Sequence, residues 1–266
     1  MGLSRVKTIV AGGSIPKSLV VAGGACLLAY AAPARATGFV LNFEDHPAGT
    51  IIDDEYAAQG VHISVQRSSS GPAVATLYDT ARSGEPDPDL QNPFDVGNLA
   101  PLGPGGNVLI IPENRTDRDD DGLIDQPNDE GSRPAGQFTF DFDMPVEAFG
   151  FNLVDVEGPE EYDRNSGYFA SFYLNGDLEA RVGFGSFIDP DSPFYDPSVE
   201  YGNNSANVIL PITARELGLP YFDRVVLNFG GSGGTDNILF TPIPEPSSAV
   251  VLGVTVPALA LMRRRR

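Results

Sequence analysis

The sequence predicts an all-β fold, an antiparallel β-sandwich, for residues 37–243. Phe138, Phe140 and Phe142 alternate with polar residues in strict period two, which is typical of a half-buried strand. Asn175-Gly176 stands between two apolar runs, and this dipeptide is the strongest short hairpin signal because both positions tolerate positive φ. Short apolar runs separated by Gly, Pro and Asp turns occur along the whole segment, and such a pattern favours two packed antiparallel layers.

Each element follows from the same patterns. Strands are expected, in chain order, at residues 39–43, 61–65, 107–111, 138–142, 149–153, 168–174, 178–184, 208–210, 224–229 and 237–240. Helix is nearly absent, and only residues 213–217 are expected to make a helical turn or two, closed by Gly218. Residues 68–106 and the acidic residues 115–133 interrupt the strands and are predicted to be long loops, where function usually resides on a rigid scaffold.

The first 36 residues have the pattern of a signal peptide. Arg5, Lys7 and Lys17 precede an apolar run at 18–32, and Ala34-Arg35-Ala36 forms an A-x-A cleavage site. The mature chain is therefore expected to begin after Ala36; a retained N-terminal anchor is the alternative. The single cysteine lies within this leader, so the mature domain is expected to contain no disulfide.

Charge is divided sharply along the chain. Residues 37–243 carry nine arginines and 35 carboxylates, which leaves a net charge of −26. Such a charge repels nucleic acid and anionic lipid and favours solubility and divalent cations. A solvated acidic exterior without any ligand is the alternative explanation of these carboxylates.

The C-terminal stretch, residues 244–266, has three parts in strict order. Pro244-Glu245-Pro246 is followed by an apolar run at 249–262 and then by a basic cluster of Arg263, Arg264, Arg265 and Arg266. The prolines keep the motif extended, the apolar run partitions into hydrocarbon as a short helix, and arginines remain on the cytoplasmic side of a membrane. Fourteen apolar residues are fewer than the ~20 that span a bilayer, so snorkelling arginines and local thinning of the bilayer are needed to make up the difference.

In this order the three parts resemble the sorting tail of PEP-CTERM proteins, also called the ice-binding protein C-terminal domain. The resemblance implies transient anchoring in the inner membrane of a Gram-negative bacterium and processing by an exosortase. It further implies export to the cell-envelope surface or the extracellular matrix, in association with extracellular polysaccharide. The alternative is a plain C-terminal membrane anchor. Ice binding is not expected, because no regular Thr-rich face is visible.

The exported segment also resembles the jelly-roll domains that are common in this family. Three pieces carry the resemblance, at residues 43–50, 56–61 and 235–240. It implies a jelly-roll-like order of strands.

The most specific cluster of ligand-type residues is a calcium-like loop at residues 117–128. Carboxylates at Asp117, Asp119, Asp121 and Asp125 occupy loop positions 1, 3, 5 and 9, with a glycine at position 6. Ca²⁺ takes six to eight oxygen ligands, and the carbonyl of Leu123 and the side chain of Asn128 are further candidates. The spacing resembles EF-hand, dockerin and thrombospondin type 3 loops, although an EF-hand has a glutamate at position 12, where this chain has Asn128. Asp129 or Glu130 is the alternative ligand at this end of the loop. An acidic solvated loop is the alternative, and Asp120 is expected to face solvent.

A weaker second metal site pairs Glu44 with Asp236, because the first and last strands of a jelly roll often lie side by side. An ordinary turn at Asp236 is the alternative.

Catalysis is not expected, because the chain has only two histidines, His46 and His62, and no recognisable nucleophile turn. The favoured function is a calcium-stabilised, exported structural protein of the cell surface or matrix. The alternative is a carbohydrate-binding module, and a glycoside-active enzyme is a third possibility. Loop aromatics are the candidates for stacking on sugars, unless they only plug loops onto the core: Tyr78, Phe94, Tyr162, Phe194 and Tyr195.

Overall fold

The computed structural model describes residues 37–81, 87–100, 106–159 and 167–244. The expected signal peptide with Ala34 and Ala36, the sorting tail from Glu245 onward and the candidate Tyr162 lie outside the described residues. The described residues belong to one compact unit that consists mostly of antiparallel β-sheet, which confirms the all-β prediction.

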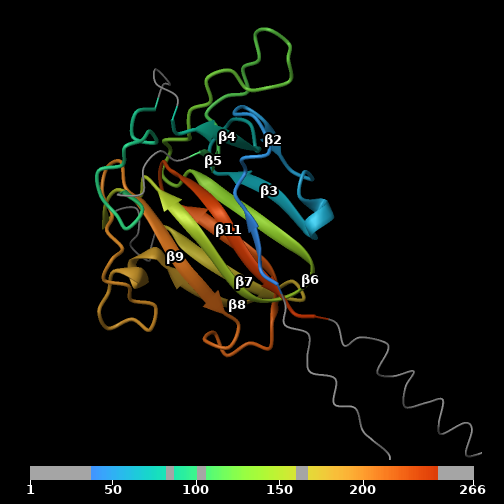
Figure 1. Ribbon diagram of the computed structural model, residues 1–266, viewed down its shortest axis with the longest axis vertical. Coiled ribbons are helices and arrows are strands. Elements are labelled where there is room, and N and C mark those ends of the chain that lie inside the picture. The colour runs from blue at the N-terminus through green and yellow to red at the C-terminus, as the bar shows by residue number, and fades with distance from the viewer. Residues whose placement is uncertain (1–36, 82–86, 101–105, 160–166, 245–266) are drawn as a thin grey trace, which may run out of the picture. The chain divides into compact units, whose positions relative to one another are not determined.

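The strands follow one another with few helical interruptions (Figure 1). They are β1 (Phe39–Leu41), β2 (Ile51–Ile52), β3 (Val61–Arg67), β4 (Ala75–Asp79), β5 (Asn107–Ile110), β6 (Gly136–Val154), β7 (Phe169–Leu174), β8 (Asp177–Gly183), β9 (Ala206–Thr213), β10 (Phe222–Phe229) and β11 (Gly234–Pro242). Two short 3₁₀ helices, η1 (Ala57–Gln59) and η3 (Phe184–Phe187), lie between them.

Strand β6 connects two ladders. Its first half pairs with β3 on one side and β10 on the other, through residues 136–142. Its second half pairs with β11 and β9, through residues 146–154. Pro145 lies between these halves, where the strand changes partners and the missing N–H of proline removes little from either ladder. The two expected strands 138–142 and 149–153 are therefore one continuous strand.

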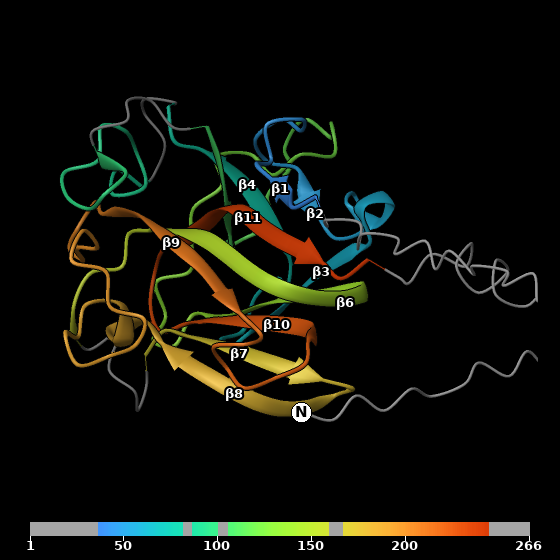
Figure 2. The same ribbon diagram turned by 60° about the horizontal axis from the view of Figure 1, so that its bottom comes forward.

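Beyond β6 the two ladders have different members. One continues through β10 and β7 to β8, and the other runs through β11 to β1 and, at the opposite end of β11, to β5, β4 and β2. Figure 2 shows β7, β8 and β10 lying beneath β6, β9 and β11. Phe39 pairs with Phe240, so the chain enters and leaves the described fold on adjacent antiparallel strands.

Aromatic rings fill the space between the ladders. Phe138 and Phe140 are fully buried, as the period-two alternation predicts, and so is Phe149 on the second half of β6. The ring of Phe151 lies 5.8 Å from that of Phe184, which in turn stacks on Tyr168 at 5.3 Å. This core gives the surface loops a rigid support.

The predicted hairpin is confirmed, and one predicted loop is wrong in part. Asn175 and Gly176 have φ values of 54° and 89° between β7 and β8, as their sequence requires. Residues 68–106 contain β4, which pairs with β5 and is buried on both faces. A strand buried on both faces shows no alternation of polar and apolar residues, so its pattern is not visible in the sequence. Residues 213–217 form a single hydrogen-bonded turn, closed by Gly218 with a φ of 74°.

Candidate metal centre

The acidic loop is closed at its base and pinned near its far end. At the base, the Glu113 N–H donates to the Asn128 carbonyl at 2.8 Å, and the Glu130 N–H donates to the Ile111 carbonyl at 2.8 Å. Farther out, the Ile124 N–H donates to the Gly49 carbonyl at 2.8 Å, and the Ile124 side chain is buried. The loop is therefore held against the fold by its backbone, whereas most of its carboxylates face outward.

Backbone hydrogen bonds wind the chain around Asp117. Its two carboxylate oxygens accept the N–H groups of Asp121 at 3.2 Å and Gly122 at 3.0 Å. Gly122 has a φ of 88°, which a glycine adopts without strain. The Asp121 carboxylate in turn accepts the Leu123 N–H at 2.9 Å.

This winding gathers three carboxylates at one place. Oxygen atoms of Asp117, Asp119 and Asp121 all lie within 4.8 Å of one another. Asp119 and Asp121 also line an open cleft of about 390 Å³ together with Asp125. A hard cation bound among these oxygens replaces like-charge repulsion with attraction, so the arrangement is suited chemically to a divalent metal ion.

The remaining predicted ligands are placed differently. Asp125 is half-buried and accepts the Arg118 N–H at 2.9 Å, so it braces the loop from the edge of the cleft. Asp120 is exposed with a φ of 59° and contributes no oxygen to the three-carboxylate cluster. Leu123 lines the cleft. The side-chain oxygen of Asn128 is buried and has no hydrogen-bond partner among the described residues.

Beneath the loop lies an ion pair that the sequence analysis missed. Arg67 on β3 pairs with Glu130, and both side chains are 6% exposed. The same glutamate accepts hydrogen bonds from the Ser69 hydroxyl at 2.8 Å and from the Ser132 N–H at 2.8 Å. Both carboxylate oxygens are thus committed to the fold, and this pair anchors the returning end of the acidic loop.

Two further buried carboxylates lie near the ends of β6 and β11. Asp129 accepts the N–H of Gly233, and burial together with the nearby Asp87 raises the pKa of Asp129 well above its usual range. Asp155 accepts the N–H of Asn204 at 3.0 Å, and burial raises the pKa of Asp155 to about 7. The sequence contains no signal that separates these aspartates from the many exposed ones.

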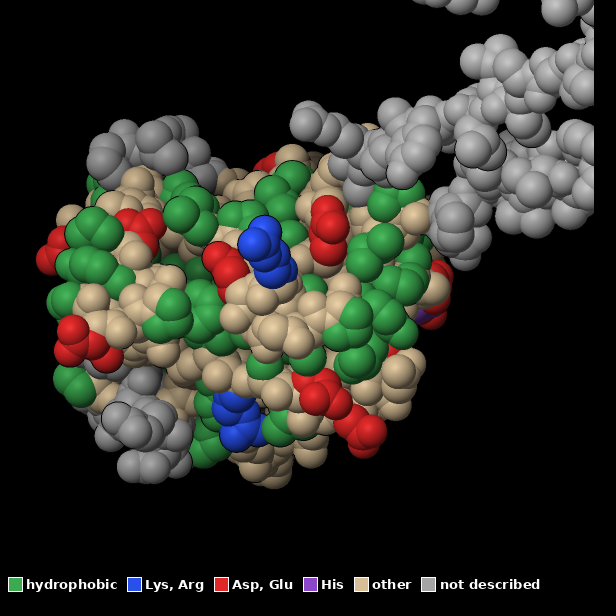
Figure 3. Space-filling view, turned by 90° about the horizontal axis from the view of Figure 1, so that it is seen from below, with side chains coloured by type: hydrophobic (Ala, Val, Ile, Leu, Met, Phe, Trp, Pro, Cys, Tyr) green, Lys and Arg blue, Asp and Glu red, His purple; other side chains and the backbone are tan. Residues whose placement is uncertain are grey.

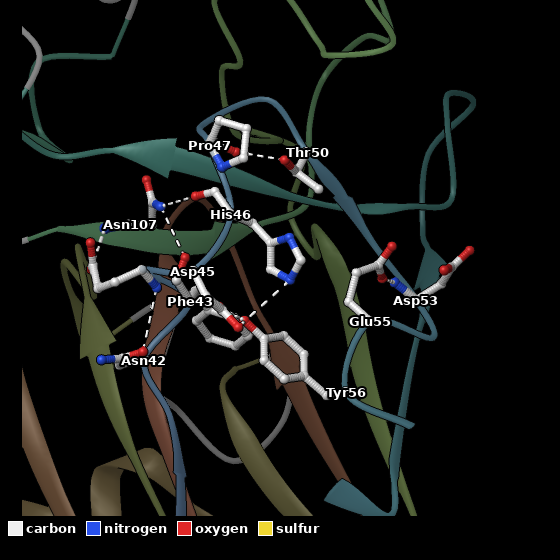
Figure 4. Close-up of polar contacts among 11 residues, drawn as sticks. Asn42, Phe43, Asp45, His46, Pro47, Thr50, Asp53, Glu55, Tyr56 and Asn107 are labelled. Atoms are coloured by element: carbon white, nitrogen blue, oxygen red, sulfur yellow. Dashed lines mark hydrogen bonds and ion pairs between the residues drawn. The ribbon is translucent and has the colours of Figure 1, made fainter. Parts of the chain in front are cut away.

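The second predicted metal pair is close in space but is engaged by protein donors. Glu44 accepts the Asn107 N–H at 2.8 Å, and the Asn107 amide donates to the carbonyls of Phe43 and His46 (Figure 4). Asp236 accepts the Asn237 N–H at 2.5 Å; burial raises the pKa of Asp236 to about 7, and the charge of Glu44 adds to this effect. The pair therefore interacts electrostatically, while β11 is bulged at this point.

The histidines also face carboxylates. His62 lies 2.7 Å from Asp54 and 3.4 Å from Asp143, all on the surface. Near His46, the Tyr56 hydroxyl donates to Asp45 at 2.6 Å (Figure 4).

The candidate stacking aromatics divide into buried and exposed residues. The prediction that Tyr78 is a loop aromatic available for stacking is wrong. Tyr78 is fully buried on β4, and its hydroxyl donates to the Asp87 carbonyl at 2.6 Å. Phe94 is half-buried and packs against the small cluster around Tyr78. Phe194 is half-buried at the edge of the main core, and Tyr195 is 41% exposed. Phe194 and Tyr195 line a groove on the surface.

Among the described residues, no helix has the length and hydropathy needed to cross a membrane. A scan against models of protein families finds no match for this chain, and a search of curated proteins finds no similar sequence.

Proposed function

We propose that this chain is an exported structural protein of the cell surface or extracellular matrix, sorted through its PEP-CTERM tail and stabilised by calcium. The tail residues Pro244 to Arg266 support the sorting part. The observation that carries the calcium part is the convergence of Asp117, Asp119 and Asp121 on a loop wound by its own backbone.

The positions of the chain's processing sites support this proposal. Strand β1 begins three residues after Ala36, and β11 ends two residues before Pro244. The two proposed cleavage sites thus flank the fold closely, and β1 and β11 lie side by side. Cutting at both sites leaves every described strand in the exported product.

The strand order supports a jelly-roll-like sandwich. Along the chain, β1, β9 and β11 lie in one ladder and β3, β7, β8 and β10 lie in the other, with β6 in both. Strands that follow one another along the chain mostly lie in different groups, with the β7–β8 hairpin as an exception, and the first strand pairs with the last.

The sorting part is tested by the intact mass of the native surface protein. We expect a species that begins at Thr37 and ends near Pro244-Glu245-Pro246. Recovery of a mature species that still carries Arg263 to Arg266 would contradict sorting by this tail.

Calorimetric titration of the full chain with Ca²⁺ tests the metal part. We expect saturable binding with a dissociation constant of about 10⁻⁴ to 10⁻³ M, which is the range of extracellular sites. Asp119→Ala combined with Asp121→Ala is expected to abolish the heat, while Asp120→Ala leaves most of it. An absence of heat in the wild type would contradict calcium binding and would favour the alternative, an acidic solvated loop without a ligand.

The alternative of a carbohydrate-binding module is favoured by one observation, the groove that Phe194 and Tyr195 line. We place this groove within the proposed matrix protein as a site of contact with polysaccharide.

A further inference from the structure

A groove of about 370 Å³ runs between β9 and the segment that follows η3. Its floor is apolar and firm, because Phe187, Ile209 and Ile212 are buried in the core. Its rim is exposed: Leu210 is 65% and Tyr195 is 41% accessible to solvent. An apolar floor with an exposed aromatic rim fits the flat face of a sugar ring, which presents C–H groups.

The segment that carries the aromatic rim is held in place by hydrogen bonds. The Tyr195 N–H donates to the Ser192 carbonyl at 3.2 Å, and the Phe194 N–H donates to the Ser192 hydroxyl at 3.1 Å. The Asp196 N–H donates to the Phe187 carbonyl at 2.8 Å, which ties the segment to η3. The aromatic rim is thus ordered before any ligand arrives, and this lowers the entropic cost of binding.

Two carboxylates line the groove, and each is oriented through one oxygen only. Asp196 Oδ1 accepts the N–H and the hydroxyl of Ser198, at 2.8 and 2.6 Å. Glu216 Oε2 accepts the N–H and the hydroxyl of Thr213, both at 2.8 Å, and these bonds lower the pKa of Glu216. Within the described part of the chain, the second oxygen of each carboxylate has no protein donor. Both are therefore acceptors oriented in advance for hydroxyl or amino groups of a ligand.

The groove continues onto the neighbouring sheet surface. A second groove of about 310 Å³ shares Ile209 and Pro211 with the first and runs over β6, β11 and β1. Its lining is almost wholly apolar, and Val40 on its edge is 53% exposed. Gly150 forms part of its floor, where a Cβ would lie 3.2 Å from Pro211. Two joined grooves suit a polymer of several sugar units better than a single small molecule.

Charge limits which polymer fits. Of the residues that the structure describes, no arginine lines either groove, and Asp196 and Glu216 are the charged residues that line them. Residues 37–243 as a whole carry a net charge of −26. The surface in Figure 3 likewise shows hydrophobic side chains in patches among acidic ones, with few basic side chains. Uronate or sulfated polysaccharides are thus repelled by this surface.

We propose that the joined grooves bind a non-acidic polysaccharide, with a sugar ring against Tyr195 and sugar hydroxyls donating to Asp196 and Glu216. This inference rests on the proposed matrix function and names the class of polysaccharide that the protein contacts.

The test is a titration of the full chain in a zwitterionic detergent, because detergents with sugar headgroups compete for the groove. The probes are oligosaccharides of a neutral β-glucan, of chitosan and of a polyuronate. We expect binding of the first or second probe and none of the third. Tyr195→Ala is expected to weaken binding by about tenfold, because it removes the aromatic face on which the sugar ring stacks. Glu216→Gln keeps an oxygen for Thr213 and is expected to weaken binding by a smaller factor.

Phe39→Ala is the matched control, because Phe39 is an aromatic residue with a similar exposure of 38% that lines neither groove. Equal binding by Tyr195→Ala and wild type, a preference for the polyuronate, or no binding of any probe would overturn the inference. Self-association that Tyr195→Ala abolishes, without glycan binding, would assign the groove to a second copy and would also overturn it. Calcium heat and the native mass are measured separately, so failure here leaves the proposed function standing.

Discussion

Residues 117–130 and the strand ends beneath them contain two groups of carboxylates with opposite surroundings. Asp117, Asp119 and Asp121 gather on the outside of the acidic loop, where Asp117 is half-buried and the other two are exposed to water. Glu130, at the returning end of the loop, and Asp155, directly after β6, are buried. The exposed carboxylates are charged and repel one another. The buried carboxylates have lost their hydration, so the protein must supply a counter-charge or favour the protonated form.

The compensation differs even within the buried group. Glu130 is neutralised by Arg67, whereas burial raises the pKa of Asp155 to about 7, which favours its protonated form. The exposed group consists of three carboxylates, and Arg118 lines the cleft beside Asp119 and Asp121. A divalent cation bound among the carboxylate oxygens would relieve their mutual repulsion. Removing an arginine, changing the pH and removing calcium should therefore act on three different carboxylate sites.

The largest effect is expected from breaking the buried ion pair. Arg67→Ala leaves Glu130 buried without a counter-charge, and such a loss costs about 3–5 kcal/mol of the free energy of unfolding. Arg133→Ala is the matched control, because its pair with Glu157 is exposed, with side chains 52% and 31% accessible, and such pairs contribute about 1 kcal/mol or less. Urea unfolding of both variants measures the difference. Equal losses would show that burial of the Arg67 pair does not matter.

The next effect concerns pH. The folded-state pKa of Asp155 lies near 7, above the unfolded value, so the folded state binds the extra proton. The contribution of Asp155 to the free energy of unfolding is fully present below about pH 4. It decreases as the pH rises to 7, by up to about 4 kcal/mol.

Asp155→Asn keeps an acceptor for the Asn204 N–H and is expected to flatten this part of the pH profile. The measurement is the free energy of unfolding at pH 5 and pH 8, with Asp177→Asn on the exposed start of β8 as control. An unchanged pH slope in Asp155→Asn would show that the buried aspartate keeps its usual pKa.

A smaller effect is expected where the loop docks on the fold. Gly49 has a φ of 85°, and a Cβ there would lie 2.5 Å from the Ile124 carbonyl oxygen. Gly49→Ala is therefore expected to cost about 1–3 kcal/mol through strain and to detach the loop. Gly176→Ala has a similar φ of 89° and no atom within 4 Å of the new Cβ, so it measures the backbone strain alone. Thermal unfolding that is shifted equally in both variants would argue against docking through Gly49.

The smallest effect is expected from removal of calcium. At millimolar Ca²⁺ and the weak affinity of extracellular sites, the gain in stability is about 0.4–1.4 kcal/mol by mass action. Chelation should lower the melting temperature by a few degrees, expose a protease site between Asn114 and Arg133, and leave the core folded. A collapse of the whole fold on chelation would contradict the view of the loop as an appendage pinned at Gly49.

Several features follow from the sequence alone because local chemistry decides them. Alternation of Phe138, Phe140 and Phe142 predicts which face of β6 is buried, and Asn175-Gly176 predicts the hairpin. The spacing of Asp117, Asp119 and Asp121 predicts their convergence, because the hydrogen bonds that Asp117 accepts join residues four and five positions apart.

Other features depend on contacts between distant parts of the chain, and only the tertiary structure decides them. Tyr78 looks like a loop aromatic until β4 pairs with β5 and buries it. Arg67 meets Glu130 across 63 positions, and Asp155 acquires its raised pKa because strands far apart in sequence exclude water from it. Burial is a property of the assembled fold, so chemically identical aspartates become a candidate metal ligand, a brace of the loop or a group with a raised pKa according to what packs over them.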